Sequence, residues 1–106
     1  MNSGIESNNQ RLNNNQVVLL DKAQIALDAL PTRDQGTVIR AMNCLEEDPF
    51  CSQTQTYKLK SIPNYFIARA GLKYRIIFKF QDREITIIDI VNHDRLEKFY
   101  GSLKEV

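Results

Sequence analysis

The segment KYRIIFKF at residues 73–80 decides the fold, because large apolar side chains alternate in it with mostly basic ones. A period of two is typical of a β-strand with one buried face. We expect the buried face to consist of Tyr74, Ile76, Phe78 and Phe80. The opposite face is expected to present Lys73, Arg75, Ile77 and Lys79.

The residues on either side of this segment extend the prediction to a sheet. Residues 65–70 (YFIARA) precede Gly71, so they predict a strand that ends in a turn. The polar residues 81–84 (QDRE) predict a second turn, followed by a strand at residues 85–91. The register of this second hairpin stays open, because its turn contains no glycine.

The first half of the chain predicts two helices. After a candidate strand at residues 17–20 (VVLL), Asp21 is expected to cap a helix that ends before Pro31. Thr32 and Gln35 match the capping box of a second helix, which closes at residues 46–49 (EEDP). Each helix has one apolar face, so both are expected to pack on the sheet.

A last helix is expected at residues 95–103, where leucine and aromatic residues recur at helical spacing. The predicted order of elements is therefore β-α-α-β-β-β-α. Two helices near the N-terminus and a set of consecutive strands indicate an α+β fold.

The 106 residues are expected to form one small domain. Residues 1–16 contain eight Asn or Gln, so we interpret them as a flexible tail before a single domain at residues 17–106. The chain has no apolar run of about 18 residues and no secretory signal, which predicts a cytoplasmic protein without a membrane partner. In that compartment Cys44 and Cys51 are expected to be free thiols, and a disulfide between them is the less supported alternative.

The charges of the chain are sorted by position. Residues 1–56 carry a net charge of −3 and residues 57–106 a net charge of +4. Between residues 57 and 80 there are six Lys or Arg and no Asp or Glu. This distribution favours a partner that carries phosphates or carboxylates, although a solvated sheet face remains the alternative.

Three residues are candidates for chemistry. A mid-strand Arg75 needs water, a carboxylate or a ligand, so it forms either a structural ion pair with Asp89 or a phosphate contact. His93 suits a general acid or base, or it is an incidental surface histidine. Tyr100 either supports phosphate chemistry or packs the last helix. One histidine with scattered carboxylates gives no metal site, and no cofactor motif is present.

The second half of the chain resembles the RelE/ParE superfamily, toxins of bacterial type II toxin–antitoxin systems. The similar segments are KLK at residues 58–60 with Pro63, YRIIF at residues 74–78 and HDRLEKFY at residues 93–100. The order of strand and helices in the first half agrees, so the resemblance covers residues 17–100. It implies a small α+β domain in which two N-terminal helices pack on a curved antiparallel sheet.

The resemblance also implies an activity and a set of site residues. Members similar to RelE bind the ribosome and cleave mRNA without a metal, by attack of a 2′-hydroxyl on the adjacent phosphate. By this resemblance Arg75 contacts the scissile phosphate, His93 and Tyr100 move protons, and Arg95 is the candidate for a second arginine, with imperfect spacing. The residues expected to hold RNA or the ribosome are Lys58, Lys60, Arg69, Lys73 and Lys79.

One departure from the pattern keeps other functions open. Phe66 and Ala68 stand where some ribosome-dependent relatives carry lysines. The alternatives are therefore a gyrase inhibitor similar to ParE without nuclease chemistry, and a non-toxic binding module of the same fold. In each case a cognate antitoxin is the expected partner, with the ribosome and mRNA, or DNA gyrase, as the target.

Overall fold

The computed structural model describes the backbone of residues 15–60 and 62–100. It describes the side chains of residues 15–60 and 62–96. Most of the expected tail, residues 1–14, lies outside the described residues. Asn15 and Gln16, which we had placed in the tail, are bonded to the domain: the Asn15 amide donates to the Glu46 carbonyl at 2.8 Å, and the Gln16 amide donates to the Arg83 carbonyl at 2.9 Å.

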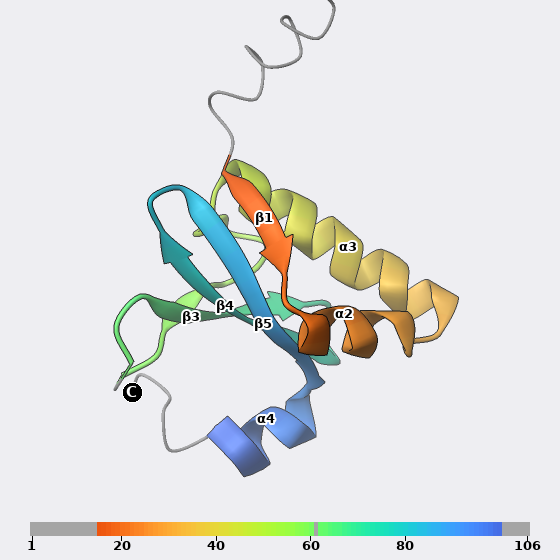
Figure 1. Ribbon diagram of the computed structural model, residues 1–106. Helices are drawn as coiled ribbons and strands as arrows, with labels where there is room; N and C mark the ends of the chain where they lie inside the picture. Colours follow the sequence, from red (N-terminus) through yellow and green to blue (C-terminus); the bar gives the residue numbers. More distant parts are fainter. Residues whose placement is uncertain (1–14, 61, 101–106) are drawn as a thin grey trace, which may run out of the picture.

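The described chain forms a five-stranded sheet with three helices (Figure 1). The elements are β1 (Gln16–Leu19), α2 (Asp21–Asp28), α3 (Thr32–Glu47), β2 (Tyr57–Lys58), β3 (Tyr65–Ala70), β4 (Tyr74–Gln81), β5 (Glu84–Asn92) and α4 (His93–Tyr100). The expected α+β class and the position of the two N-terminal helices are confirmed. The short strand β2 is an addition, since we had assigned its residues to a loop.

The strand order in the sheet is β1-β5-β4-β3-β2. Neighbouring strands are antiparallel, as expected, except β1, which pairs parallel with β5. The first strand of the domain thus lies beside the last one (Figure 1), because helices α2 and α3 carry the chain across the sheet.

Each face of the sheet contributes to a core. On one face Ile76 and Phe78 pack under α2 and α3, where Leu27 and Val38 are also buried, with Tyr74 and Phe80 partly buried beside them. This is the face that the alternation in residues 73–80 predicts. On the other face a second, smaller core contains Leu59, Ile67, Ile77, Val91 and Leu96 of α4. The face that we expected to be opposite the core is therefore itself covered in its centre, where Ile77 is fully buried.

A β-bulge in β5 shifts its pairing with β4 by one residue. Ile77 lies opposite Asp89 and Phe78 lies opposite Ile87, so β5 has one extra residue at this point. Ile87 and Ile90 consequently both reach the core under α2 and α3. The hairpin between β4 and β5 turns on Asp82 and Arg83, whose φ angles are 53° and 65°. Two consecutive positive φ values are the geometry of a two-residue type I′ turn, here formed without glycine.

The helix starts differ from the predicted caps. The N-cap of α2 is Leu20 and that of α3 is Pro31, and neither makes a side-chain capping bond. Thr32 is the first residue inside α3, so the predicted capping box is wrong. The Gln35 side chain instead donates to the Leu27 carbonyl at 3.1 Å, which joins α3 to the end of α2. The Leu27 carbonyl also accepts the Leu30 amide at 3.1 Å, so the Gln35 side chain is a second donor at the end of α2.

The two cysteines form a disulfide. Cys44 in α3 and Cys51 in the following loop have Cα atoms 6.5 Å apart, so the expectation of free thiols is wrong. The chain reverses after α3 because the Phe50 amide donates to the Asp48 side chain at 2.9 Å and the Cys51 amide donates to the Asp48 carbonyl at 3.0 Å. This turn brings Cys51 back beside the end of the helix.

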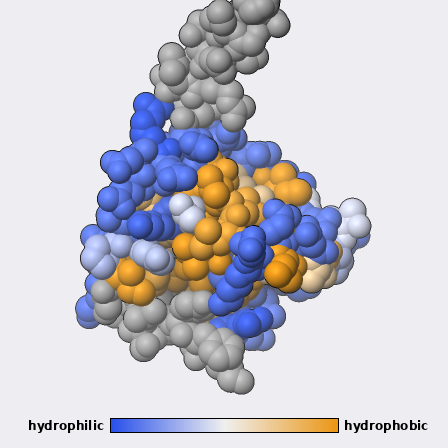
Figure 2. Space-filling model, in the orientation of Figure 1, coloured by the Kyte–Doolittle hydropathy of each residue, from blue (hydrophilic) through white to orange (hydrophobic). Residues whose placement is uncertain are grey.

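Apolar residues are also visible on the surface. Figure 2 shows an apolar area over β1 and β5, framed by hydrophilic residues. On α2, Ile25 is 68% exposed, and Leu20 before it is 43% exposed. No helix in the described part of the chain is long and apolar enough to cross a membrane.

Candidate functional site

The candidate site is a surface hollow where the turn between β3 and β4 meets the start of α4. Its volume is about 390 Å³. It is lined by Leu72, Lys73, Arg75, Asn92, His93 and Asp94. We call it the Arg75–His93 hollow, because it brings together two of the three residues that the sequence marked as candidates for chemistry.

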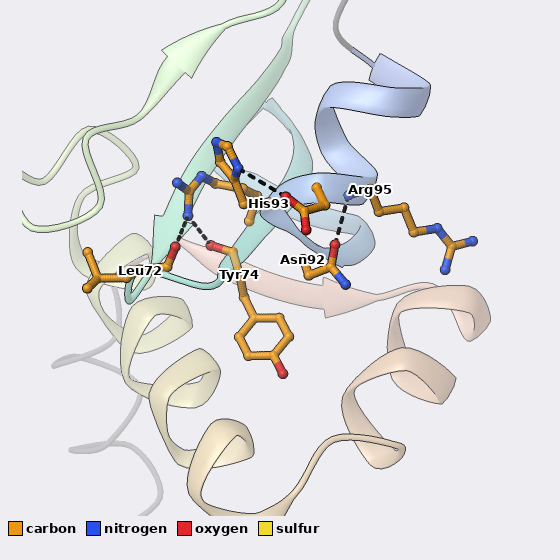
Figure 3. Close-up of polar contacts among 7 residues, drawn as sticks. Leu72, Tyr74, Asn92, His93 and Arg95 are labelled. Atoms are coloured by element: carbon orange, nitrogen blue, oxygen red, sulfur yellow. Dashed lines mark hydrogen bonds and ion pairs between the residues drawn. The ribbon is translucent and has the colours of Figure 1, made fainter.

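Arg75 is the most buried cation of the hollow, with 8% of its surface exposed. Its Nη1 atom donates to the Tyr74 carbonyl at 2.8 Å and to the Leu72 carbonyl at 3.4 Å (Figure 3). These carbonyls hold the guanidinium in one orientation. A buried arginine fixed in this way presents its planar donor set in a defined direction, which suits a phosphate oxygen or a carboxylate.

Arg75 and Asp89, the two residues of the alternative ion pair, are not directly opposite each other in the sheet. Arg75 lies opposite Val91, and Asp89 lies opposite Ile77 because of the bulge. The Asp89 carboxylate lies 3.2 Å from Lys22 Nζ of α2, and it also accepts the Ile90 amide at 2.8 Å. Asp89 thus joins α2 to the sheet.

His93 is the first residue of α4, two positions before the predicted start of that helix. The helix begins here because the Asn92 side chain accepts the Arg95 amide at 2.8 Å, which is an N-cap bond (Figure 3). The His93 amide donates to the Lys73 carbonyl at 2.7 Å, so the start of α4 is tied to the β3–β4 turn. The His93 side chain is half exposed, and its Nδ1 atom lies 3.9 Å from Asp94.

The other predicted residues are more widely spread. Lys73 lines the hollow, but its ammonium lies 3.8 Å from Asp34 of α3, so the expected row of three cations along residues 73–80 is interrupted. Lys58 lies opposite Phe66, which packs in the core under α2 and α3, so Lys58 belongs to the other face of the sheet from Arg75. Lys60 is exposed and does not line the hollow.

The remaining predicted residues lie at the margins. Lys79 shares the face of Arg75, four residues along β4, opposite Tyr65. Arg69 lies directly opposite Arg75, and its guanidinium donates to the Gln55 side chain. In Figure 3 the Arg95 side chain extends away from His93, and it does not line the hollow. Tyr100 ends α4, and its side chain lies outside the described residues.

Sequence reasoning missed Asn92 and Asp34. Asn92 lines the hollow and caps α4, and an Asn directly before a helical pattern is a signal that could have revealed it. Asp34 accepts the Tyr74 hydroxyl at 2.8 Å, and no sequence signal connects residues 40 positions apart. Among the residues that the structure describes, no three His, Cys, Asp or Glu side chains form a group that could hold a metal ion.

Tyr74 predicts a pH dependence of stability. The hydrogen bond to Asp34, followed by burial and the charge of Asp34, raises the pKa of Tyr74. Because this folded-state pKa exceeds the unfolded value of about 10, the stabilisation is complete below about pH 10 and is lost as pH rises through the raised pKa. We expect Tyr74→Phe to lower the free energy of unfolding by about 1–2 kcal/mol at neutral pH and to make its alkaline decline shallower.

Urea unfolding of both proteins between neutral and alkaline pH measures these effects. Tyr65→Phe is the matched control at neutral pH, because the structure records no hydrogen bond for the Tyr65 hydroxyl. An identical alkaline decline in wild type and Tyr74→Phe would show that the Asp34 contact is absent in solution.

The chain is similar in structure to several toxins. It aligns with the RelE–RelB complex of Pyrococcus horikoshii at a TM-score of 0.65 and 23% identity, over 76% of this chain and 97% of that one. The RelBE2 toxin–antitoxin complex of Mycobacterium tuberculosis gives 0.63 and 23%, over 76% and 99%. The E. coli DinJ–YafQ complex gives 0.65 and 15%, over 77% and 96%.

No protein-family model matches the chain, and no curated protein matches it by sequence. At these identities the structural likeness establishes the fold. The resemblance to the RelE/ParE superfamily that we drew from residues 58–100 is therefore confirmed at the level of the fold.

Proposed function

We propose that this chain, which has the fold of the RelE and YafQ toxins, is the toxin of a type II toxin–antitoxin system and cleaves mRNA on the ribosome. The observation that carries the proposal is the meeting of Arg75 and His93 in one hollow. One is a buried, oriented guanidinium and the other a half-exposed imidazole. Cleavage of a phosphodiester bond needs both a group that stabilises the developing negative charge and a group that moves a proton.

The proposed reaction uses the 2′-hydroxyl of the RNA as nucleophile. His93 takes the proton of this hydroxyl, whose oxygen forms a bond to the adjacent phosphorus, and the bond from phosphorus to the 5′-oxygen breaks. Arg75 stabilises the charge that develops on the phosphoryl oxygens. The 5′-oxygen leaves with a proton from Tyr100 or water, which gives a 2′,3′-cyclic phosphate and a 5′-hydroxyl end.

Three features support a cognate antitoxin as partner. The structural neighbours RelE and YafQ were solved in complexes with RelB and DinJ. The acid-free stretch at residues 57–80 offers basic groups to an acidic segment. The apolar area over β1 and β5 suits the apolar side chains of the same partner (Figure 2). We place this pair of proteins, with the ribosome and mRNA, in the cytoplasm.

A pair of assays on the purified protein tests the proposed activity. We expect it to stop translation in a reconstituted system and to produce mRNA fragments with 5′-hydroxyl ends only when ribosomes are present. We expect DNA supercoiling by gyrase to be unaffected at the same concentration. Inhibited supercoiling with intact mRNA would replace the proposal by the gyrase inhibitor, and no effect in either assay would indicate a non-toxic binding module.

A further inference from the structure

A second hollow lies on the other side of the β3–β4 turn, between α3, the loop before β2 and β3. Its volume is about 280 Å³, and its lining includes Thr37, Arg40, Cys44, Thr54, Arg69 and Gly71. No carboxylate lines it. We call it the Arg40–Arg69 hollow, after the two guanidinium-bearing residues in its wall.

Neither arginine is neutralised within the described chain. Arg40 Nη2 donates to the Thr37 hydroxyl at 3.3 Å, and Arg69 Nη1 donates to the Gln55 side chain. Neither guanidinium forms an ion pair with a carboxylate among residues 15–60 and 62–96. Two cations at one concave site without a counter-charge attract an anion, and a guanidinium presents several donors to its oxygens.

The position of Arg69 indicates what kind of anion fits. Arg69 lies directly opposite Arg75 on the neighbouring strand. Like charges directly opposite each other destabilise a sheet, and anions bound at both would offset that repulsion. Since Arg69 lines one hollow and Arg75 the other, a chain of regularly spaced negative charges can occupy both.

The β3–β4 turn connects the two hollows. Gly71 lines the Arg40–Arg69 hollow, and the next two residues, Leu72 and Lys73, line the Arg75–His93 hollow. A strand of nucleic acid that places one phosphate at Arg75 therefore passes this turn on its way to Arg69. A single-stranded backbone carries one negative charge per nucleotide, which matches such a series of sites.

We propose that the Arg40–Arg69 hollow binds a backbone phosphate of single-stranded RNA, close to the phosphate that meets Arg75. The inference rests on the proposed function in taking RNA as the polyanion. Arg69 of β3 supplies one positive charge to this hollow, and Arg40 of α3 supplies the second. The hollow positions the strand and takes no part in bond breaking.

Binding of an RNA that cannot be cleaved tests this subsite apart from any catalysis. The probe is a short 2′-O-methyl oligoribonucleotide, titrated into the ¹⁵N-labelled protein while backbone amides and arginine Nε–H signals are followed by NMR. We expect saturable shifts at Gly71, Thr37 and the side chains of Arg40 and Arg69. We expect Arg40→Gln to weaken binding about tenfold, the effect of losing one charge-assisted contact.

Arg33→Gln is the matched control, because it removes the same charge from the same helix. Arg33 is exposed on α3, as Arg40 is, but does not line the hollow. We expect it to change affinity less than twofold. The salt dependence should separate the two variants as well: Arg40→Gln should lower the slope of log K against log salt by about 0.7, the value for one phosphate contact to a single strand.

Equal losses in Arg40→Gln and Arg33→Gln would overturn the proposal, because the effect would then be one of net charge. Shifts at the hollow with inorganic phosphate but not with the oligonucleotide would overturn it in favour of a free anion site. Stronger Arg40-dependent binding of a hexaglutamate peptide would overturn it in favour of an acidic protein segment. If Arg75 and His93 variants still cleave mRNA, the proposed catalysis fails while the binding result at Arg40 stands.

Discussion

Replacing Arg75 with glutamine is expected to lower ribosome-dependent mRNA cleavage by about 10²–10³-fold, the loss typical of removing one group that stabilises charge in a transition state. Arg75 is buried, and two carbonyl groups fix its guanidinium. We therefore expect that no neighbouring cation can replace this guanidinium in the same orientation. Arg75→Lys keeps the charge but loses the planar donor set, and we expect it to recover only a small part of the activity. Single-turnover cleavage of a defined mRNA on stalled ribosomes measures both variants.

A structural role of Arg75 must be separated from a catalytic one. Its bonds to the Leu72 and Tyr74 carbonyls also hold the turn, so Arg75→Gln is expected to lower the melting temperature by a few degrees. Cleavage is therefore compared well below that temperature, with Arg33→Gln as a control for one lost charge on an exposed position. Cleavage by Arg75→Gln within tenfold of wild type under these conditions would remove Arg75 from the proposed mechanism.

The second large effect is expected from Gly71→Ala. Gly71 has a φ angle of +69°, and a Cβ atom added there would lie 2.8 Å from Thr37 Cγ2. The left-handed backbone costs an alanine about 1–2 kcal/mol, and the overpacking against α3 adds a cost of similar size. We expect the free energy of unfolding to fall by about 2–4 kcal/mol, measured by urea denaturation.

A double-mutant cycle separates the two costs. Thr37→Ser removes the clashing methyl group but keeps the hydroxyl that donates to the Arg33 carbonyl. We expect Gly71→Ala to be about 1 kcal/mol less harmful in the Thr37→Ser background, because only the backbone cost then remains. A coupling energy near zero would contradict the close packing of the turn against α3. Activity should fall with stability, since the same turn lines the Arg75–His93 hollow.

An element could be predicted from the sequence when neighbouring residues determine it, and could not when contacts between distant segments determine it. The helices and strands were predictable because periodicity records which side chains avoid water, and β3 was predicted to the residue. The helix caps were not, because Gln35, which the pattern assigned to a capping box, donates to the end of α2 instead. The extra residue in β5 was also missed, because apolar side chains lie on both faces of this strand and obscure the change in alternation.

For the candidate site, too, some residues could be named from the sequence and others only from the structure. Arg75 and His93 were named from the sequence, and the structure places them in one hollow. Lys58, named as a residue that would hold RNA or the ribosome, lies on the opposite face of the sheet from Arg75. Arg40 was overlooked because it belongs to a helix far away in sequence, and only packing of α3 beside β3 brings it to Arg69.

By itself, then, the sequence determined the class of fold, the face of β4 that is buried and the excess of positive charge in the second half. Each of these follows from composition and from periodicities of a few residues. Only the tertiary structure decided which cations share a hollow, that Lys73 is drawn to Asp34, and that Cys44 meets Cys51. Those outcomes depend on distances between elements, which are set by the twist of the sheet and the packing of helices on it.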